Sequence, residues 1–409
     1  MGYSQSMKTD NSRKNQVVVL GLCPTGLAVI RALGRKEIAV NGVDKDRWAV
    51  GFFSRYCKKL GHFDIDKQSE AAALLQSLIE YGRKASKKPV LLATSDDFLV
   101  FLAKHNETLR EFYIFPEITE EVLDNFLNKK RFYQICSRNG VVTPRTFFLE
   151  KDRINSIANE VSYPCIFKPI YTHIWDRKLK GLKAFMVNSP SEFIERYNMV
   201  KTLGLSNNIM VQEVVEGPTE EIYIFAAYFD KNSKPLGIFT GRKLRQYPPD
   251  FGNTTLAEGF VCEEISSKAI DILTKMKYHG LCDVEFKRDR KDNKLKIIEI
   301  NPRPGRWYSL AEESGINLLY NAYLDLIGEK VDSQDHVMES GKKWVFWERD
   351  IFTVIGYINK KMLDASGYYK SINGKKVNAI YAKDDKLPAL IYPFNQILML
   401  LKRKLLCAN

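Results

Sequence analysis

The sequence predicts an α/β unit built on a parallel sheet, followed by an α+β part built on antiparallel strands. Strands and helices alternate over residues 16–105, whereas long strands follow one another closely from Tyr163 onward. The 409 residues are too many for one compact core, so two or three packed units are expected. A hydrophobic content of 45% supports a folded chain rather than a disordered one.

The first segment reads as a strand, a helix and a second strand. An apolar strand covers Gln16–Gly21, a turn of small residues precedes the helix, and the second strand ends at Asp44. Gly21, Gly26 and Asp44 match three positions of a dinucleotide-binding fingerprint. Cys23 stands where the middle glycine would let the backbone approach a pyrophosphate. We therefore expect a structural Rossmann-like turn, with a Rossmann oxidoreductase as the disfavoured alternative.

Further alternation extends this unit. Hydrophobic patterning predicts a helix over Ala71–Arg83, a buried strand over Pro89–Ala93 and another helix over Phe98–His105. The polar residues 94–97 either cap the last helix or line the crevice at the carboxyl end of the strand.

The following residues mark the change to the second part. Two helices are expected over residues 119–139, joined near Asn128, and the second begins at Lys129 and stops at Gly140. We predict a helix over Ser267–Met276 and a terminal helix over Phe394–Leu406 that carries basic residues. The expected strands are Pro164–Lys168, Ala184–Val187, Ile209–Val215, Glu221–Phe229 and Pro235–Lys243, followed by a hairpin of Cys282–Lys287 and Lys294–Ile300.

The hairpin carries the most informative chemistry. Glu285 and Glu299 lie on its two strands, and Asn301 shares the face of Glu299 in an extended chain. Two carboxylates and an amide oxygen suit Mg²⁺, and Arg303 and Arg306 follow at once as phosphate ligands. An amphipathic hairpin with its acidic residues in water is the alternative. An ionised Glu299 in an otherwise apolar strand, however, needs a partner.

These residues resemble the metal-binding end of the ATP-grasp superfamily, through Asp283–Lys287 (DVEFK) and Ile298–Arg303 (IEINPR). Other segments follow in the order of that superfamily, so the resemblance covers roughly residues 16–330. It is closest to the carboxylate–amine ligases that resemble carbamoyl-phosphate synthase and D-aspartate ligase. It implies an ATP-grasp fold preceded by a Rossmann-like pre-ATP-grasp domain.

The resemblance also implies roles for individual residues. Lys129 and Lys168 would bind ATP, and Lys168 lies in an apolar strand where an anionic partner is favoured. The hinge strand would offer its backbone to adenine, with Glu220 or Glu221 near the ribose. Lys243 and Arg245, with Arg303 and Arg306, would act near the γ-phosphate or the substrate. The implied hinge residues are Gln212, Glu213, Val214 and Val215, and the implied metal ligands are Glu285, Glu299 and Asn301.

One segment departs from the superfamily pattern. Many members have a glycine-rich phosphate loop after the second lysine, whereas residues 170–183 are charged and contain a single glycine, Gly181. We expect a loop that orders over ATP as a lid. Lys178, Lys180 or Lys183 would then contact phosphate, with an ordinary basic surface loop as the alternative.

The implied reaction joins a small carboxylate, such as an amino acid, to an amine through an acyl phosphate, with ATP and Mg²⁺, or Mn²⁺ in its place. The amine would belong to a cell-wall or surface-polysaccharide precursor, a peptide or ammonia. An ATP-binding sensor or regulatory subunit without turnover is the main alternative. A nucleic-acid-binding protein, prompted by a net charge of +13, is disfavoured because the basic residues cluster at ATP-grasp positions and at the extreme end.

The expected organisation is a flexible segment 1–15, a Rossmann-like domain 16–125, an ATP-grasp domain 126–330 with a lid subdomain 140–208, and an extension 331–409. The chain has no run of about 18 apolar residues, so no transmembrane helix is expected. Its seven cysteines lack CxxC spacing, which favours a cytoplasmic protein. The basic terminal helix either packs on the body or touches an anionic membrane face. A homodimer is one assembly that the chain could form.

Overall fold

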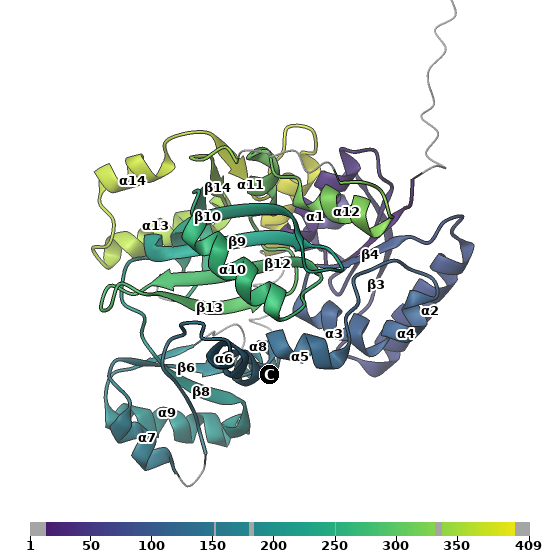
Figure 1. Cartoon of the computed structure of the whole chain (residues 1–409). Helices are drawn as coiled ribbons and strands as arrows, with labels where there is room; N and C mark the ends of the chain where they lie inside the picture. Colours follow the sequence, from purple (N-terminus) through teal and green to yellow (C-terminus); the bar gives the residue numbers. More distant parts are fainter. Residues whose placement is uncertain (1–13, 151–152, 180–183, 250, 332–337, 397–409) are drawn as a thin grey trace, which may run out of the picture. The chain divides into compact units, whose positions relative to one another are not determined.

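The computed structural model describes residues 14–150, 153–179, 184–249, 251–331 and 338–396. The chain divides into two compact units, which we describe separately (Figure 1). The first combines the described parts of residues 1–117, 319–331 and 380–409. The second combines residues 118–318 with the described part of 332–379. Within the described residues, no helix has both the length and the apolar character needed to cross a membrane.

The first unit is built on a parallel sheet, as predicted. Its strand order is β3-β2-β1-β4. The strands are β1 (Val17–Leu20), β2 (Val40–Asp44), β3 (Cys57–His62) and β4 (Val90–Ala93). The helices of this unit are α1 (Pro24–Gly34), η1 (Val50–Phe53), α2 (Gln68–Lys84), α3 (Asp96–Lys104), α4 (Asn106–Arg110) and most of α12 (Leu318–Leu326).

The turn after β1 has structural contacts. The Asp44 carboxylate accepts hydrogen bonds from the backbone N–H groups of Leu22 and Asp46. A Cβ atom at Gly26 would lie 2.0 Å from the carbonyl oxygen of Gly21, so only glycine fits this approach of helix to strand. The Asp44 carboxylate is therefore occupied by hydrogen bonds from neighbouring backbone N–H groups.

The chain returns to this unit after residue 379. Asp385 accepts hydrogen bonds from Nε of Arg31 on α1 (2.9 Å) and from the Ser54 hydroxyl (2.7 Å). The Arg31 and Asp385 side chains are 7% and 1% exposed, so this is a buried ion pair rather than a surface contact. Residues 387–396 are helical, and most of the predicted helix Phe394–Leu406 lies outside the described residues.

The second unit contains a small antiparallel sheet of order β5-β8-β6-β7. Its buried side includes Phe167, Phe193 and Trp175. The expected charged loop 170–183 is instead helical over much of its length, because the fully buried Trp175 packs into this core and against Phe185. The elements are β5 (Thr146–Phe148), α7 (Ile154–Glu160), β6 (Cys165–Pro169), α8 (Thr172–Leu179), β7 (Phe185–Val187), α9 (Pro190–Thr202), η3 (Ser206–Asn208) and β8 (Ile209–Glu213).

A larger sheet of order β13-β12-β9-β10-β11-β14-β15 forms the rest of this unit. All its pairs are antiparallel except β14–β15. The strands are β9 (Ile222–Phe229), β10 (Pro235–Tyr247), β11 (Asn253–Gly259), β12 (Gly280–Arg288), β13 (Leu295–Asn301), β14 (Lys343–Val345) and β15 (Lys376–Asn378). The helices are α5 (Glu120–Leu127), α6 (Lys129–Arg138), η4 (Thr219–Glu221), α10 (Glu263–Lys275), α11 (Tyr308–Glu313), α13 (Trp347–Asn359) and α14 (Ala365–Ile372).

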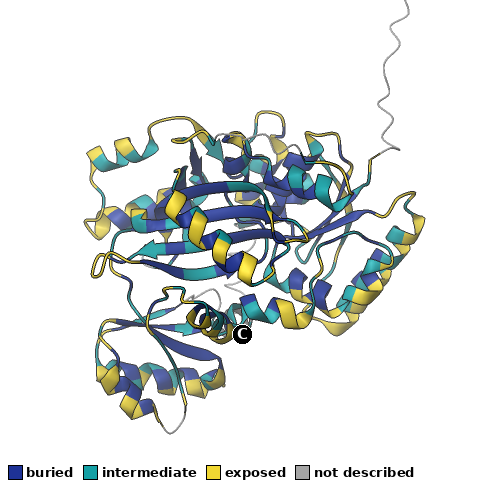
Figure 2. Cartoon of the chain, in the orientation of Figure 1, coloured by how far each residue is buried: buried dark blue, intermediate teal, exposed yellow. Residues whose placement is uncertain are grey.

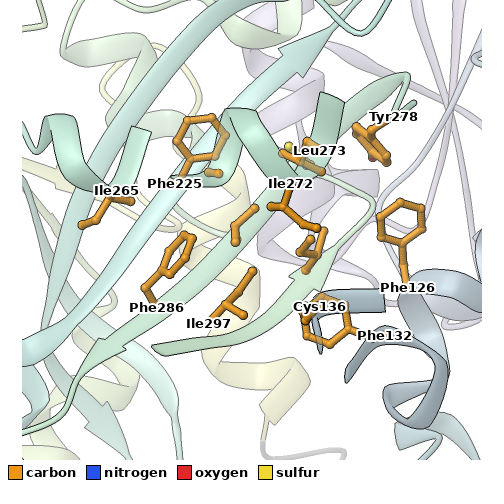
Figure 3. Close-up of a cluster of buried hydrophobic side chains, with 14 of the residues drawn as sticks. Phe126, Phe132, Cys136, Phe225, Ile265, Ile272, Leu273, Tyr278, Phe286 and Ile297 are labelled. Carbon is orange, nitrogen blue, oxygen red and sulfur yellow. The ribbon is translucent and has the colours of Figure 1, made fainter. Parts of the chain in front are cut away.

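One face of the larger sheet forms a hydrophobic core with α10, α5 and α6 (Figure 3). Phe225, Phe286 and Ile297 point into it from three strands, and Ile272 and Phe132 meet them from α10 and α6. The strands are largely buried whereas α10 keeps an exposed outer face (Figure 2). Because side chains alternate along a strand, the residues between these core positions face the other side of the sheet.

Candidate active site

The two predicted carboxylates lie directly opposite each other. Glu285 on β12 is the cross-strand partner of Glu299 on β13. A register shift follows at once, since Phe286 pairs with Ile297 and leaves Ile298 as an extra residue. This bulge lets Ile297 enter the core while Glu299 stays beside Glu285 on the opposite face. Local backbone geometry therefore builds the acidic pair.

A lysine neutralises one member of this pair. Nζ of Lys243 on β10 lies 2.6 Å from Oε2 of Glu285, and the lysine side chain is only 5% exposed. A buried ammonium requires such a partner. The contact unites one predicted catalytic residue with one predicted metal ligand.

Asn301 and Arg303 extend the cluster. The Asn301 amide donates to Oε1 of Glu299 at 3.2 Å, and Arg303 donates to the Asn301 amide oxygen at 3.3 Å. Arg306, at the end of the same loop, is partly buried. The described contacts and strand pairing thus bring five predicted site residues together: Lys243, Glu285, Glu299, Asn301 and Arg303.

Asp283 is a member of this cluster that the sequence analysis missed. It is paired with Asn301 and lies two residues before Glu285, so it shares the face of the two glutamates. Burial, together with the charge of Glu285, raises the pKa of Asp283 to about 8. Its carboxylate accepts a hydrogen bond from the Trp307 indole at 3.2 Å. The alternation of side chains along β12 was the signal that could have identified Asp283, because it places Asp283 on the same face as Glu285.

The donor set fits a hard divalent cation. Within the described residues, no group of three or more His, Cys, Asp or Glu side chains is arranged to hold a metal ion. The predicted set instead combines two carboxylates with one amide oxygen, and Mg²⁺ accepts few protein ligands when phosphate oxygens and water complete its shell. Glu285, Glu299 and Asn301 would hold such an ion, which would supply charge neutralisation to bound phosphates.

Both lysines that are predicted to bind ATP donate hydrogen bonds to polar side chains. Lys168 on β6 donates to the Gln212 amide oxygen on β8 at 3.1 Å, which joins two predicted nucleotide-binding residues. Lys129, the first residue of α6, donates to the Thr172 hydroxyl at 3.0 Å. Lys183 lies outside the described residues.

Tyr133 connects the two groups of predicted residues. Its hydroxyl donates to the carbonyl oxygen of the bulged Ile298 at 2.8 Å. Burial raises the pKa of Tyr133, and its neighbours include the Gln212 side chain and the charge of Glu299. The Lys168–Gln212 pair and the acidic cluster therefore meet around one buried phenol.

The predicted hinge ends β8. Oε1 of Glu213 accepts hydrogen bonds from the Arg145 backbone and from Nζ of Lys296, both at 2.9 Å. Lys287 donates to the carbonyl oxygen of Val215 at 2.7 Å, and burial lowers the pKa of that lysine. The hinge is thereby tied to β12 and β13.

The remaining hinge residues and the two ribose candidates follow on the chain. Val214 is partly exposed and Val215 is buried. Glu220 is exposed, whereas Glu221 accepts a hydrogen bond from the Tyr223 hydroxyl at 3.2 Å. No described contact joins either glutamate to the Lys168–Gln212 pair.

Arg245 is not brought beside Lys243. On β11, Ala257 is opposite Lys243 while the adjacent Leu256 is opposite Arg245. Neighbouring strand residues face opposite sides, so this bulge sends the two basic side chains to opposite faces. Arg245 instead forms a buried ion pair with Asp350 on α13, in which each side chain is 1% exposed.

The sequence is similar to a known family and to a known ligase. Residues 255–331 match the family described as the ATP-binding domain of the carbamoyl-phosphate synthase L chain. The chain is 25% identical over 264 residues to D-aspartate ligase of Enterococcus faecium, a match that covers 63% of this chain and 62% of the relative. The chain thus matches less than two thirds of that relative's length.

Solved structures show the same fold. L-amino acid ligase from Bacillus licheniformis aligns with a TM-score of 0.61 at 15% identity, covering 81% of this chain and 79% of that one. Biotin carboxylase of Campylobacter jejuni aligns with a TM-score of 0.61 at 14% identity, covering 82% and 75%. At these identities the comparison establishes the ATP-grasp fold.

Proposed function

We propose that the chain is an ATP-dependent carboxylate–amine ligase of the ATP-grasp superfamily, a proposal supported by the family match, the relation to D-aspartate ligase and the shared fold. The observation that carries the proposal is the pairing of Glu285 with Glu299, completed by Asn301 and by the cation of Lys243. This arrangement suits nucleotide phosphates that bind together with a divalent cation.

The reaction would proceed in two steps. A carboxylate oxygen of the substrate attacks the γ-phosphorus of ATP, so that ADP leaves and an acyl phosphate remains. An amine nitrogen then attacks the acyl carbon, phosphate leaves with the bonding electrons, and the amine loses a proton. The protein would act by positioning and by charge compensation, with Lys243 and Arg303 beside the acidic cluster.

The nucleotide would be held by the elements that meet around Tyr133. Lys168 and Gln212 are adjacent, and Lys129 opens α6, the helix that carries Tyr133. The backbone from Glu213 to Val215 would receive the adenine, and Glu221 would face the ribose. In our proposal Arg245 supports the fold, because its guanidinium is held by Asp350.

An amino acid is our proposed carboxylate substrate. The relation to D-aspartate ligase and the fold shared with L-amino acid ligase support this choice. The amine would belong to a cell-wall or surface-polysaccharide precursor, to a peptide or to ammonia.

Formation of ADP and phosphate tests this function. The purified chain is incubated with ATP and Mg²⁺ and screened against pools of amino acids and amines, beside Glu299→Gln. The exposed Glu263 on α10 provides a matched control, Glu263→Gln. Turnover that needs one pool of each kind and is lost only in Glu299→Gln supports the ligase. ATP binding without turnover in any pool favours the alternative, a nucleotide-binding sensor.

A further inference from the structure

Helix α13 exposes a continuous apolar face. Ile351, Phe352, Ile355 and Ile358 are each more than half exposed, although they are large hydrophobic residues. Their spacing places them on one side of the helix, and Met362 continues the row just beyond its end. The exposed side of α13 is visible in Figure 2. Single exposed apolar residues are common, whereas a row of four on one helix, continued by Met362, indicates an interaction surface.

The opposite side of α13 is firmly held. Asp350 is fixed by the ion pair with Arg245, and the Thr255 hydroxyl donates to the same carboxylate at 2.7 Å. Tyr357 shares a hydrogen bond of 2.9 Å with Thr219. The orientation of the helix is therefore determined by buried polar contacts, which leave the apolar row outward.

Two lysines lie at the carboxyl-terminal end of this row. Lys360 and Lys361 follow α13 directly, and Lys370 at the end of α14 is also exposed. Tyr369, which is 75% exposed, adds an aromatic ring of the kind enriched at membrane interfaces.

The acidic residues of this segment do little to offset that charge. Asp350 is neutralised in its buried pair, and Glu348 is partly buried with a pKa that burial raises. Asp364 remains, and its carboxylate caps α14 by accepting the Gly367 N–H at 2.6 Å. Within residues 347–372 the exposed charged side chains are therefore mainly positive.

We propose that the exposed face of α13, with Lys360 and Lys361 at its carboxyl-terminal end, docks on an anionic lipid bilayer. An apolar row followed by lysines matches both the acyl region and the phosphate layer of such a surface. A second copy of the chain is the alternative occupant, and the test below distinguishes it. The inference does not rest on the ligase activity.

Vesicle flotation of the full chain tests the proposal. Vesicles of phosphatidylcholine alone are compared with vesicles that also contain phosphatidylglycerol. Wild type is expected to float with the anionic vesicles and to remain behind with the neutral ones. Phe352→Ser combined with Ile355→Ser is expected to weaken binding by at least about tenfold. Lys360→Glu combined with Lys361→Glu is expected to weaken it by about thirtyfold, with strong dependence on salt.

Matched variants distinguish this face from the rest of the protein surface. Val122→Ser combined with Val261→Ser removes two exposed apolar side chains elsewhere in the same unit and should leave binding unchanged. Lys402→Glu combined with Lys404→Glu tests the basic carboxyl-terminal residues. All altered α13 side chains are exposed, so thermal unfolding should match wild type. The proposal is overturned if wild type fails to bind anionic vesicles, if only the carboxyl-terminal variant loses binding, or if sedimentation shows that α13 variants dissociate a dimer instead.

Discussion

Nζ of Lys243 lies 2.6 Å from Oε2 of Glu285, although strand β9 separates the strands that carry them. The register explains the contact. Glu285 is opposite Ile224, and Ile224 is opposite Gly241, which precedes Lys243 by two positions on the same face. A cation is thus held against the acidic pair by the pleat of the sheet.

The first prediction concerns this lysine. Lys243→Met removes the cation beside Glu285, and we expect ADP formation to fall by at least about a hundredfold because charge on the phosphates is no longer offset. Steady-state turnover with ATP and Mg²⁺ measures the effect. Lys275→Met is the control, since its ion pair with Asp271 is exposed. Equal activity of both variants would exclude a role for Lys243 in catalysis.

The second prediction concerns nucleotide affinity. Lys168→Met keeps the length of the side chain and loses its charge, so we expect Kd for ADP to rise by about tenfold or more. Isothermal titration measures the change, with Lys201→Met on the exposed side of α9 as the control. An unchanged Kd in Lys168→Met would remove this residue from the proposed nucleotide site.

The third prediction concerns the Arg245–Asp350 pair. Asp350→Ala leaves a buried guanidinium without its carboxylate, and we expect the free energy of unfolding to fall by about 3–5 kcal/mol. Asp271→Ala, which breaks an exposed pair, should cost less than about 1 kcal/mol. Urea denaturation measures both. A small effect of Asp350→Ala on stability, together with a large loss of turnover in Arg245→Met, would contradict the structural role of Arg245.

The fourth prediction concerns pH. The folded pKa of Asp283, raised to about 8 by burial and by Glu285, lies above its unfolded value of 3.8. The unfolded chain therefore ionises first, and this group contributes stability that is lost as the pH rises from about 4 to about 8.

Asp283→Asn removes that titration while its amide oxygen still accepts from Trp307. In buffers with EDTA, the Tm of the variant relative to wild type should be higher at about pH 8 than at about pH 5. A difference that is the same at both pH values would show that Asp283 ionises normally.

The strongest local patterns were read correctly from the sequence. The first parallel strands, the junction of two helices at Asn128 and the β12–β13 hairpin all have clear periodicity and stop signals, and each is present. Helix α8 was missed because its formation depends on burial of Trp175 in a tertiary core formed by β6, β7, β8, α7 and α9.

In the candidate site, too, some features follow from sequence patterns and others do not. Opposed glutamates follow from hairpin register, whereas the bulge that separates Lys243 from Arg245 leaves no signal in the alternation of residues. The ion pair between Asp385 and Arg31 is likewise a tertiary contact that no local sequence pattern predicts. Side-chain alternation along β12 could have predicted Asp283, because it occupies the same strand face as Glu285.

ATP turnover by wild type and Glu299→Gln tests the central claim most directly. We expect wild type to form ADP and phosphate with Mg²⁺ only when an amino acid and an amine are both present, and to form the corresponding amide in equal amount. We expect Glu299→Gln to fold normally and to lose turnover by at least about a hundredfold. Turnover that persists in Glu299→Gln, or a wild-type chain that fails to bind ATP with Mg²⁺, would contradict the account.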